Sequence, residues 1–234
     1  MTAPYLLSDE QLDLFPDVEL ALDEPNGLLA VGGDLSPQRL LAAYKKGIFP
    51  WFSDDQPVLW WSPNPRSVLK LDDFKISRSL KKTLNKKIFH VTFDTAFDDV
   101  ITACAGTRKD GFGTWITNDM LDAYRELHKQ GYAHSVECWF EQKLVGGLYG
   151  LSLGHAFFGE SMFTHKTDAS KVALAHLVWQ LKQWQFDFID TQVSSEHMAS
   201  LGASDIPRRQ FIAELQQTLK LSSRVGRWKF DMKT

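Results

Sequence analysis

The chain of 234 residues contains only two cysteines, Cys104 and Cys138, and they form neither a CxxC redox motif nor a zinc pair. A disulfide framework is therefore excluded, and we expect both thiols to be reduced. No apolar run approaches the roughly 20 residues that span a bilayer. The first 15 residues also lack the basic segment that opens a secretory signal. These absences predict a cytoplasmic protein that has no membrane partner.

Two classes of catalytic motif are also missing. None of the seven histidines shows metal-ligand spacing such as HExxH, so we expect no catalytic metal. Ser161 follows Gly159 and Glu160 but lacks the second glycine of a nucleophile elbow, which argues against a serine hydrolase.

Basic residues are absent from the first 38 positions, which hold eight acidic residues. The net charge of −3, from 26 basic and 29 acidic residues, therefore conceals an acidic head on a basic body. Within the segment 75–87, which contains no acid, lie Lys75, Arg78, Lys81, Lys82, Lys86 and Lys87. Such a run is either a solvated charged face or a patch that follows the phosphate backbone of an RNA.

The composition is typical of a soluble globular protein, with 44% hydrophobic and 24% charged residues. Residues 25–66 are dense in Gly, Pro and aromatic residues around one helix signal, which has Ser36 as N-cap, Pro37 at the first turn and Gly47 as the stop. We predict a small, loop-rich α+β domain at 1–64 and a second, larger domain at 65–234.

The second region reads as a mixed α/β (α+β) fold. Three antiparallel strands joined by hairpins are expected, followed by a long amphipathic helix and another strand. The expected elements are a helix from 117 or 118 to 131, strands 135–140, 143–150 and 155–163, a helix 169–185, a strand 186–192, a short helix ending near 202 and a helix after 207. This order matches the acyl-CoA N-acyltransferase (GNAT-like) core with a mixed sheet.

That core normally binds a pyrophosphate on a glycine-rich loop at the start of its long helix, where free N–H groups favour anions. In this chain the segment 164–171 reads THKTDASK and contains no glycine. An acyltransferase core of this kind would therefore use an acyl donor other than coenzyme A.

A carboxylate and an amide stand two positions apart in the expected strand 186–192. Asp190 and Gln192 should share a face with Phe188, at the strand end where ligand crevices form in open α/β sheets. The structural alternative is that Asp190 caps the turn that leads to Ser194.

Glu160 lies in the apolar strand FFGESMF, where a charged residue requires a specific partner. It either takes part in the chemistry or pairs with a lysine.

Eight tryptophans are many for this length. Trp51, Trp60 and Trp61 cluster with Phe49 and Phe52 in a Pro-rich stretch. Exposed aromatic planes suit stacking on bases or contact with an apolar ligand, whereas buried ones would join the two domains.

Several long strings resemble bacterial leucyl/phenylalanyl-tRNA–protein transferases, and they extend from about Glu24 to Arg209. They are EPNGLLAVGGDLSPQRLLAAYKKGIFPWF, LWWSPNPRSVL, GTWIT, AHSVECW, LVGGLYG, FFGESMF, ASK, FIDTQ and HMASLGASDIPRR. Residues 1–23 and the tail after about 220 carry no motif of this kind.

The resemblance implies transfer of Leu or Phe, and less readily Met, from an aminoacyl-tRNA to the N-terminal Arg or Lys of a protein. That transfer marks the protein for degradation through the N-degron pathway. The resemblance also implies a GNAT-like C-terminal domain that works without coenzyme A or another cofactor.

Within that reaction, the resemblance places Asp190 and Gln192 at the reacting centre. We expect Asp190 to orient the attacking amine, either as a hydrogen-bond partner or as proton acceptor, and Gln192 to fix the acceptor or the carboxylate. Glu160 would help to bind the cationic acceptor, since a desolvated cation needs an anionic partner.

The donor side chain should enter an apolar pocket that accepts Leu, Phe and Met and disfavours Ile and Val by shape. Expected pocket residues are Leu148, Phe157, Met162 and Leu177, while Trp51 and Trp115 are expected to contact the terminal adenosine. The basic residues of 75–87 would contact tRNA, and a monomer suffices for the chemistry. A coenzyme A-dependent N-acetyltransferase and a non-catalytic RNA-binding module are the alternatives.

Overall fold

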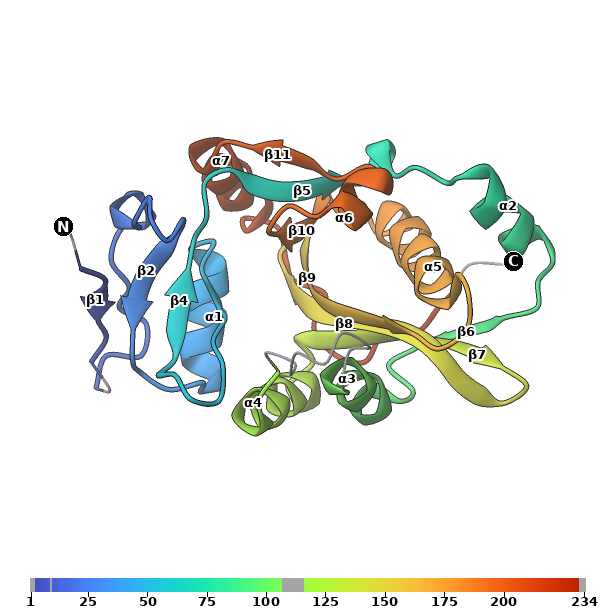
Figure 1. Ribbon diagram of the computed structural model, residues 1–234, viewed down its shortest axis with the longest axis horizontal. Helices are drawn as coiled ribbons and strands as arrows, with labels where there is room; N and C mark the ends of the chain where they lie inside the picture. The colour runs from blue at the N-terminus through green and yellow to red at the C-terminus, as the bar shows by residue number, and fades with distance from the viewer. Residues whose placement is uncertain (1–2, 9, 107–115, 232–234) are drawn as a thin grey trace.

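The protein is described by a computed structural model that covers residues 3–8, 10–106 and 116–231. A four-stranded sheet with the order β1-β2-β4-β3 lies at the N-terminal end (Figure 1). Its strands are β1 (Tyr5–Leu6), β2 (Leu28–Val31), β3 (Phe49–Pro50) and β4 (Leu59–Trp61). Sequence reasoning predicted an α+β domain here but did not locate its strands, because strands of two to four residues are too short to show alternation.

Helix α1 (Pro37–Lys45) accompanies this sheet and confirms the expected helix. The Ser36 hydroxyl accepts a hydrogen bond from the Arg39 amide, and Pro37 occupies the first turn, where an amide N–H is not needed. The chain leaves the helix at Gly47, whose φ of +74° lies in the left-handed region.

A seven-stranded sheet with the order β11-β5-β10-β9-β8-β7-β6 forms the larger part of the molecule. Its strands are β5 (Arg66–Lys70), β6 (His90–Phe93), β7 (Ala133–Phe140), β8 (Lys143–Leu153), β9 (Ala156–Thr164), β10 (Phe188–Gln192) and β11 (Ser204–Ile206). Strands β9 and β10 are parallel and the other neighbours are antiparallel, so the mixed sheet is confirmed. The three expected hairpin strands correspond to β7, β8 and β9.

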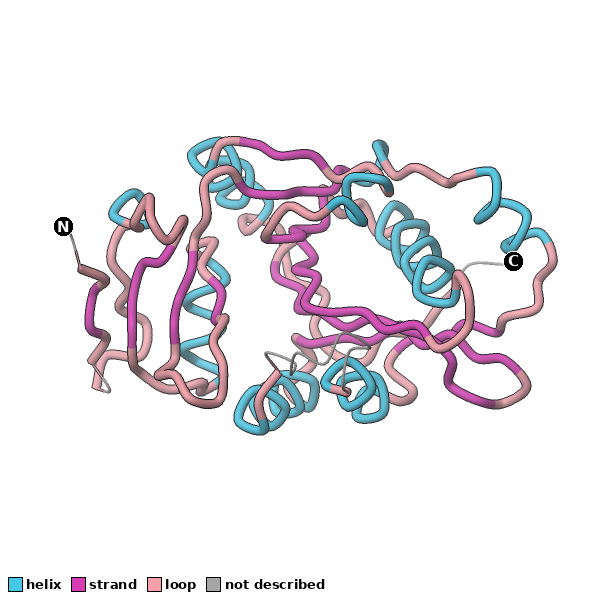
Figure 2. Tube along the Cα trace, viewed as in Figure 1, coloured by secondary structure: helices cyan, strands magenta, loops and turns pink. Residues whose placement is uncertain are grey.

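Helices cover both faces of the large sheet (Figures 1 and 2). Helix α5 (Ala169–Gln183) packs on β7 and β8 from one side, and α3 (Phe97–Ala105) and α4 (Asn118–Lys129) pack from the other. The remaining helices are α2 (Arg78–Asn85), α6 (Glu196–Ser200) and α7 (Arg208–Thr218), with short 3₁₀ turns at Val18–Leu20 and Leu71–Asp73. None of the helices within the described ranges is both long and apolar enough to cross a membrane.

Two buried clusters form the core. One joins the sheets, because it contains Leu29 and Trp60 of the small sheet together with Tyr149 and Phe158 of the large one. The other lies between α5 and the large sheet. The crossover from β9 through α5 to β10 brings the ends of the parallel strands next to the first turn of α5, where the candidate site lies.

Candidate active site

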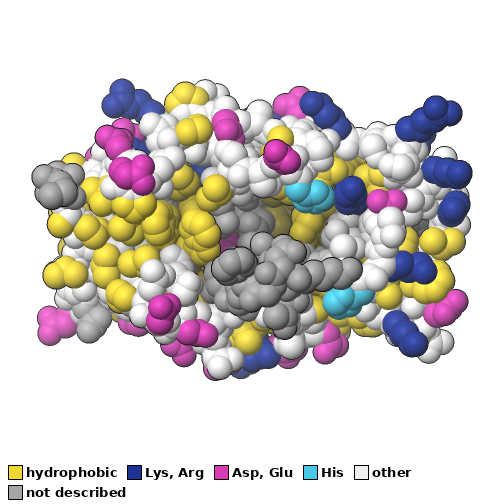
Figure 3. Space-filling view, in the orientation of Figure 1, with side chains coloured by type: hydrophobic (Ala, Val, Ile, Leu, Met, Phe, Trp, Pro, Cys, Tyr) yellow, Lys and Arg dark blue, Asp and Glu magenta, His cyan; other side chains and the backbone are white. Residues whose placement is uncertain are grey.

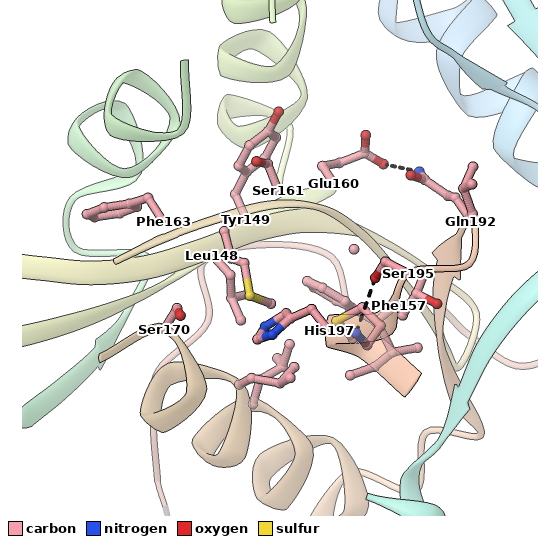
Figure 4. Close-up of a pocket in the computed structure, with 18 of the residues that line it drawn as sticks. Leu148, Tyr149, Phe157, Glu160, Ser161, Phe163, Ser170, Gln192, Ser195 and His197 are labelled. Atoms are coloured by element: carbon pink, nitrogen blue, oxygen red, sulfur yellow. Dashed lines mark hydrogen bonds between the residues drawn. The ribbon is translucent and has the colours of Figure 1, made fainter. Parts of the chain in front are cut away.

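A cavity of about 750 Å³ opens between strands β8 to β10 and helices α5 and α6. The apolar wall includes Leu148, Phe157, Met162, Leu174, Leu177 and Ile189. Glu160 and Gln192 face each other at one end of it, and His197 projects into the interior (Figure 4).

The four apolar residues expected in the donor pocket, Leu148, Phe157, Met162 and Leu177, all line this cavity. The structure thus brings together side chains from two strands and a helix that are up to 29 positions apart. Trp115 lies outside the described residues.

Trp51 also lines the cavity and is 43% exposed. Its ring packs at a tilt on Trp61, with 5.8 Å between centroids, and the Trp61 indole donates to the Trp51 carbonyl at 2.6 Å. Trp60, in contrast, is fully buried in the core between the sheets. Trp60 thus fits the alternative of a tryptophan that joins the sheets. Trp51 is partly exposed at the cavity, and its contact with a ligand remains a prediction.

The Glu160 carboxylate accepts hydrogen bonds from three side chains. The Tyr44 hydroxyl donates at 2.7 Å, the Tyr124 hydroxyl at 3.0 Å and Gln192 Nε2 at 3.0 Å. Tyr44 belongs to α1 and Tyr124 to α4, so three distant elements meet at one carboxylate. Among the described residues, no lysine forms an ion pair with Glu160, whose hydrogen-bond partners are Tyr44, Tyr124 and Gln192.

Burial raises the pKa of Glu160 to about 7, because the neutral donors around it offset only part of the lost hydration. Burial and the nearby Glu160 carboxylate together raise the pKa values of Tyr44 and Tyr124, whose hydroxyls also contact each other. Both tyrosines therefore remain protonated donors while Glu160 exchanges a proton near neutral pH.

Asp190 is placed differently from our expectation. Its carboxylate is fully buried and forms a two-point ion pair with Arg66, at 2.9 Å from Nε and 2.7 Å from Nη2. It is not among the residues that line the cavity. Contact with an incoming amine would require breaking this pair, so a direct role of Asp190 as proton acceptor does not fit the geometry.

Arg66 is held in turn by its surroundings. Its Nη1 donates to the Gly47 carbonyl at 3.1 Å, and its guanidinium lies over the rings of Phe49 and Phe211. The fully buried Arg66 guanidinium therefore has hydrogen-bond acceptors and aromatic faces around it in place of water.

Asp190 and Gln192 do not share a face, because the pairing register shifts between them and Gln192 has a φ of +63°. The bulge turns the Gln192 side chain toward Glu160. The backbone N–H of Gln192 donates to Asp190 Oδ1 at 2.9 Å. Asp190 thus fixes the backbone that presents Gln192, and this turn also agrees with the capping alternative.

The start of α5 lacks the features of a pyrophosphate site. Asp168 occupies the N-cap position without a capping hydrogen bond, and its carboxylate accepts from Thr83 at 2.8 Å. A carboxylate at this place opposes a second anion. The space beside Gly146 of β8 is occupied by α5, because a Cβ on Gly146 would lie 2.5 Å from the Ala169 Cβ.

All six basic residues of the segment 75–87 are exposed on or beside α2. Dark blue Lys and Arg side chains gather at the end of the molecule that carries α2 in Figure 3. Exposure at this end allows contact with a large polyanion, and the tRNA-binding role remains a prediction.

Sequence reasoning missed several residues of the site. Arg66, Tyr44 and Tyr124 carry no local signal of a buried polar network, since Tyr44 and Tyr124 read as apolar positions of their helices. Ser195 and His197 line the cavity from α6 and its N-cap. Arg66, Tyr44 and His197 lie in strings that resembled the family, and this resemblance was the available signal for them.

Two family profiles match the chain: that of leucyl/phenylalanyl-tRNA protein transferase over residues 68–216, and that of its N-terminal domain over 33–64. A leucyl/phenylalanyl-tRNA–protein transferase of Nitrosospira multiformis is 53% identical over 228 residues, 97% of each chain. Another, of Cellvibrio japonicus, is 59% identical over 209 residues, 89% of this chain and 86% of that protein. The solved structure of L-PGS from Bacillus licheniformis has a TM-score of 0.38 and 13% identity over 86% of this chain and 66% of that one. The sequence matches show that this chain belongs to the leucyl/phenylalanyl-tRNA–protein transferase family.

Proposed function

We propose that the chain transfers Leu or Phe, and less readily Met, from an aminoacyl-tRNA to the N-terminal Arg or Lys of a protein. The product would enter the N-degron pathway of protein degradation. The observation that carries this proposal is the apolar cavity of about 750 Å³ that ends at Glu160 and Gln192. Family membership favours this transfer over a non-catalytic RNA-binding module.

The reaction is aminolysis of an ester. The acceptor's α-amine attacks the aminoacyl carbonyl carbon, a C–N bond forms, and the bond from that carbon to the ribose oxygen breaks. One proton leaves the amine and one reaches the ribose oxygen. Because an α-amine has a pKa of about 7.7–8.0, part of it is neutral near pH 7 and no covalent enzyme intermediate is needed.

Glu160 is proposed to receive the acceptor's α-amino group and to take up its proton. A pKa of about 7 suits proton transfer near neutral pH. The hydroxyls of Tyr44 and Tyr124 and the amide of Gln192 hold the carboxylate in one orientation. Positioning by such fixed donors is a large part of catalysis in a two-substrate reaction.

Asp190 and Arg66 are proposed as positioning residues. Their ion pair anchors the bulge after β10, and the bulge directs Gln192 to Glu160. Asp190 remains part of the site in this sense, although it does not reach the cavity.

For the donor, we propose that Leu148, Phe157, Met162 and Leu177 contact the aminoacyl side chain and that Trp51 and Trp115 contact the terminal adenosine. The β9–α5–β10 crossover, with β9 and β10 parallel, supports a GNAT-like fold for residues 65–234. The aspartate at the start of α5 argues against coenzyme A as the donor.

The exposed basic residues Lys75, Arg78, Lys81, Lys82, Lys86 and Lys87 are proposed to contact the tRNA backbone. Replacing Lys81, Lys82, Lys86 and Lys87 by Gln should raise the KM for aminoacyl-tRNA several-fold. The ratio of the variant KM to the wild-type KM should be larger at low salt, because salt weakens contacts to phosphates. A minimal aminoacyl-adenosine donor should be transferred almost as well as by the wild type. Equal losses on both donors would assign the segment to folding instead.

The direct test is transfer of labelled Leu from Leu-tRNA to a peptide that begins with Arg. A peptide that begins with Gly is the matched control and should remain unlabelled. Absence of label on the Arg peptide would refute the proposal, and Ile transferred as well as Leu would refute the account of the pocket.

A further inference from the structure

The last described residues, Arg224–Asp231, form an extended segment that we call the C-terminal segment. It contains no helix or strand, yet Trp228 within it is only 2% exposed. Trp228 belongs to the buried cluster that also contains the cavity residues Leu148, Phe157 and Leu177. A side chain outside the regular elements thus completes the core beneath the donor pocket.

The segment is fixed to the body at three points. The Gly226 amide donates to the Gly131 carbonyl at 3.0 Å, and a Cβ on Gly131 would lie 2.3 Å from the Gly226 nitrogen. The Trp228 amide donates to Asp94 Oδ2 at 2.6 Å. Gln180 of α5 exchanges two hydrogen bonds with Asp231, at 2.6 and 3.1 Å. These contacts fix the segment to the turn at Gly131, to Asp94 after β6 and to helix α5.

The Trp228 indole is also fixed in orientation. It stacks on His134, with 3.7 Å between centroids and an interplanar angle of 9°. His134 Nδ1 lies 2.9 Å from Asp94 Oδ2, so one carboxylate holds both the backbone of Trp228 and the ring that covers it. The rings of Trp184 and Phe186 close the other sides edge-on.

In this position the indole packs against Phe157, with 5.9 Å between ring centroids. Phe157 is 1% exposed and lines the cavity, among the apolar side chains drawn in Figure 4. Trp228 therefore stands behind the cavity wall without reaching the cavity, since it is not one of its lining residues.

We infer that Trp228 is a positioning residue that sets the depth of the donor pocket by holding Phe157 in place. The inference rests on the proposed function, because it assigns to the cavity the aminoacyl side chain of the donor. Interiors are packed at crystal-like density, so removing part of the indole leaves space into which the Phe157 ring can move. A deeper pocket favours the longer Phe side chain over Leu.

The variant Trp228→Phe tests this. We expect the ratio of kcat/KM for Phe-tRNA to that for Leu-tRNA to rise about fivefold, which is in the range for a changed apolar pocket. The shift should lie in KM for the donors, with kcat nearly unchanged. Both donors are measured on one enzyme sample, so the fraction of folded enzyme cancels in the ratio.

The matched control is Phe230→Leu, on the same segment. Phe230 packs on Phe93 and His176, with centroid distances of 5.4 and 5.3 Å, and none of these three residues lines the cavity. The Phe230→Leu variant should loosen the C-terminal segment to a similar degree. It should leave the ratio of kcat/KM for Phe-tRNA to that for Leu-tRNA as in the wild type. A ratio that shifts equally in both variants would overturn the inference.

A double-mutant cycle separates action through Phe157 from a general effect. In a Phe157→Leu background, Trp228→Phe should add no further change in the donor ratio. An added change of the same size would overturn the inference, and so would an unchanged ratio in the single variant. Should Trp228→Phe not fold, Trp228→Tyr takes its place with the same expected direction.

The failure of the proposed function gives a different result. In that case the wild type itself labels the Arg peptide from neither donor, whereas failure of the inference leaves wild-type transfer intact.

Discussion

Two buried carboxylates lie within one site and are stabilised in opposite ways. Asp190 faces a guanidinium in a two-point ion pair, whereas Glu160 faces only neutral donors, two tyrosine hydroxyls and an amide. A cation stabilises the ionised form strongly, while neutral donors leave part of the desolvation cost in place. The difference makes Asp190 a fixed anchor and makes Glu160, with a pKa of about 7, the group that can exchange a proton.

The largest effect is expected from breaking the ion pair. Arg66→Met leaves the Asp190 charge buried without a partner and should lower the free energy of unfolding by about 3–5 kcal/mol. The double variant Arg66→Met/Asp190→Leu should recover most of that loss, because both charges are gone. Urea unfolding monitored by tryptophan fluorescence measures both. A single variant as stable as the wild type would show that the pair is not the anchor described here.

Glu160 should contribute a pH-dependent stability of about 3 kcal/mol, from a pKa shift of 4.5 to about 7. The folded state binds the Glu160 proton more tightly than the unfolded chain does. The contribution is therefore complete below pH 4.5 and is lost as the pH rises through about 7. The difference in unfolding free energy between wild type and Glu160→Gln, followed from pH 5 to pH 8 in urea, should show this slope. A flat difference would show that the pKa of Glu160 is not raised by folding.

The activity of the same variant sharpens the comparison. Glu160→Gln should lower kcat about 100-fold, a typical effect of removing a general base, and should fold normally. In the wild type kcat/KM should rise through pH 7 as Glu160 ionises. The variant should lose that inflection and keep the one that arises from the acceptor amine. If the Glu160→Gln variant transferred the amino acid nearly as fast as the wild type, another group would be the proton acceptor.

The smallest effect concerns one tyrosine. Tyr44→Phe removes a hydroxyl that donates to Glu160, so the pKa of Glu160 should rise and the inflection in activity should move upward by less than about one pH unit. Tyr149→Phe is the control, since the buried Tyr149 hydroxyl has no hydrogen-bond partner among the described residues. The control should leave the inflection in place, and an equal shift in both variants would contradict the assigned hydrogen bond.

Much of the large sheet could be predicted because its signals are local. Strands β7 to β9 alternate or run apolar over eight to eleven residues, and α5 shows an apolar face. Side chains on these elements, such as Leu148 and Leu177, were expected in one pocket and line one cavity. The strands of the small sheet were not located in advance, since they are short and pair residues such as Tyr5 and Ala30 that are distant in sequence.

The surroundings of the two carboxylates could not be read in advance. Arg66 and Asp190 are 124 positions apart, and Tyr44 and Glu160 are 116 apart. The expectation that Asp190 and Gln192 share a face follows strand periodicity, but the bulge between them breaks that periodicity. The C-terminal segment gave no pattern at all, because Trp228 is placed by Asp94 and His134 rather than by a repeat of its own.

The sequence by itself determined the family, the long elements of the large sheet and the residue types of the site, because motifs, periodicity and composition are properties of the chain alone. Only the tertiary structure decided which carboxylate pairs with a cation, which one has a pKa near 7, and which tryptophan packs behind the pocket. These outcomes depend on desolvation and on partners from distant elements, and both exist only once the chain is packed.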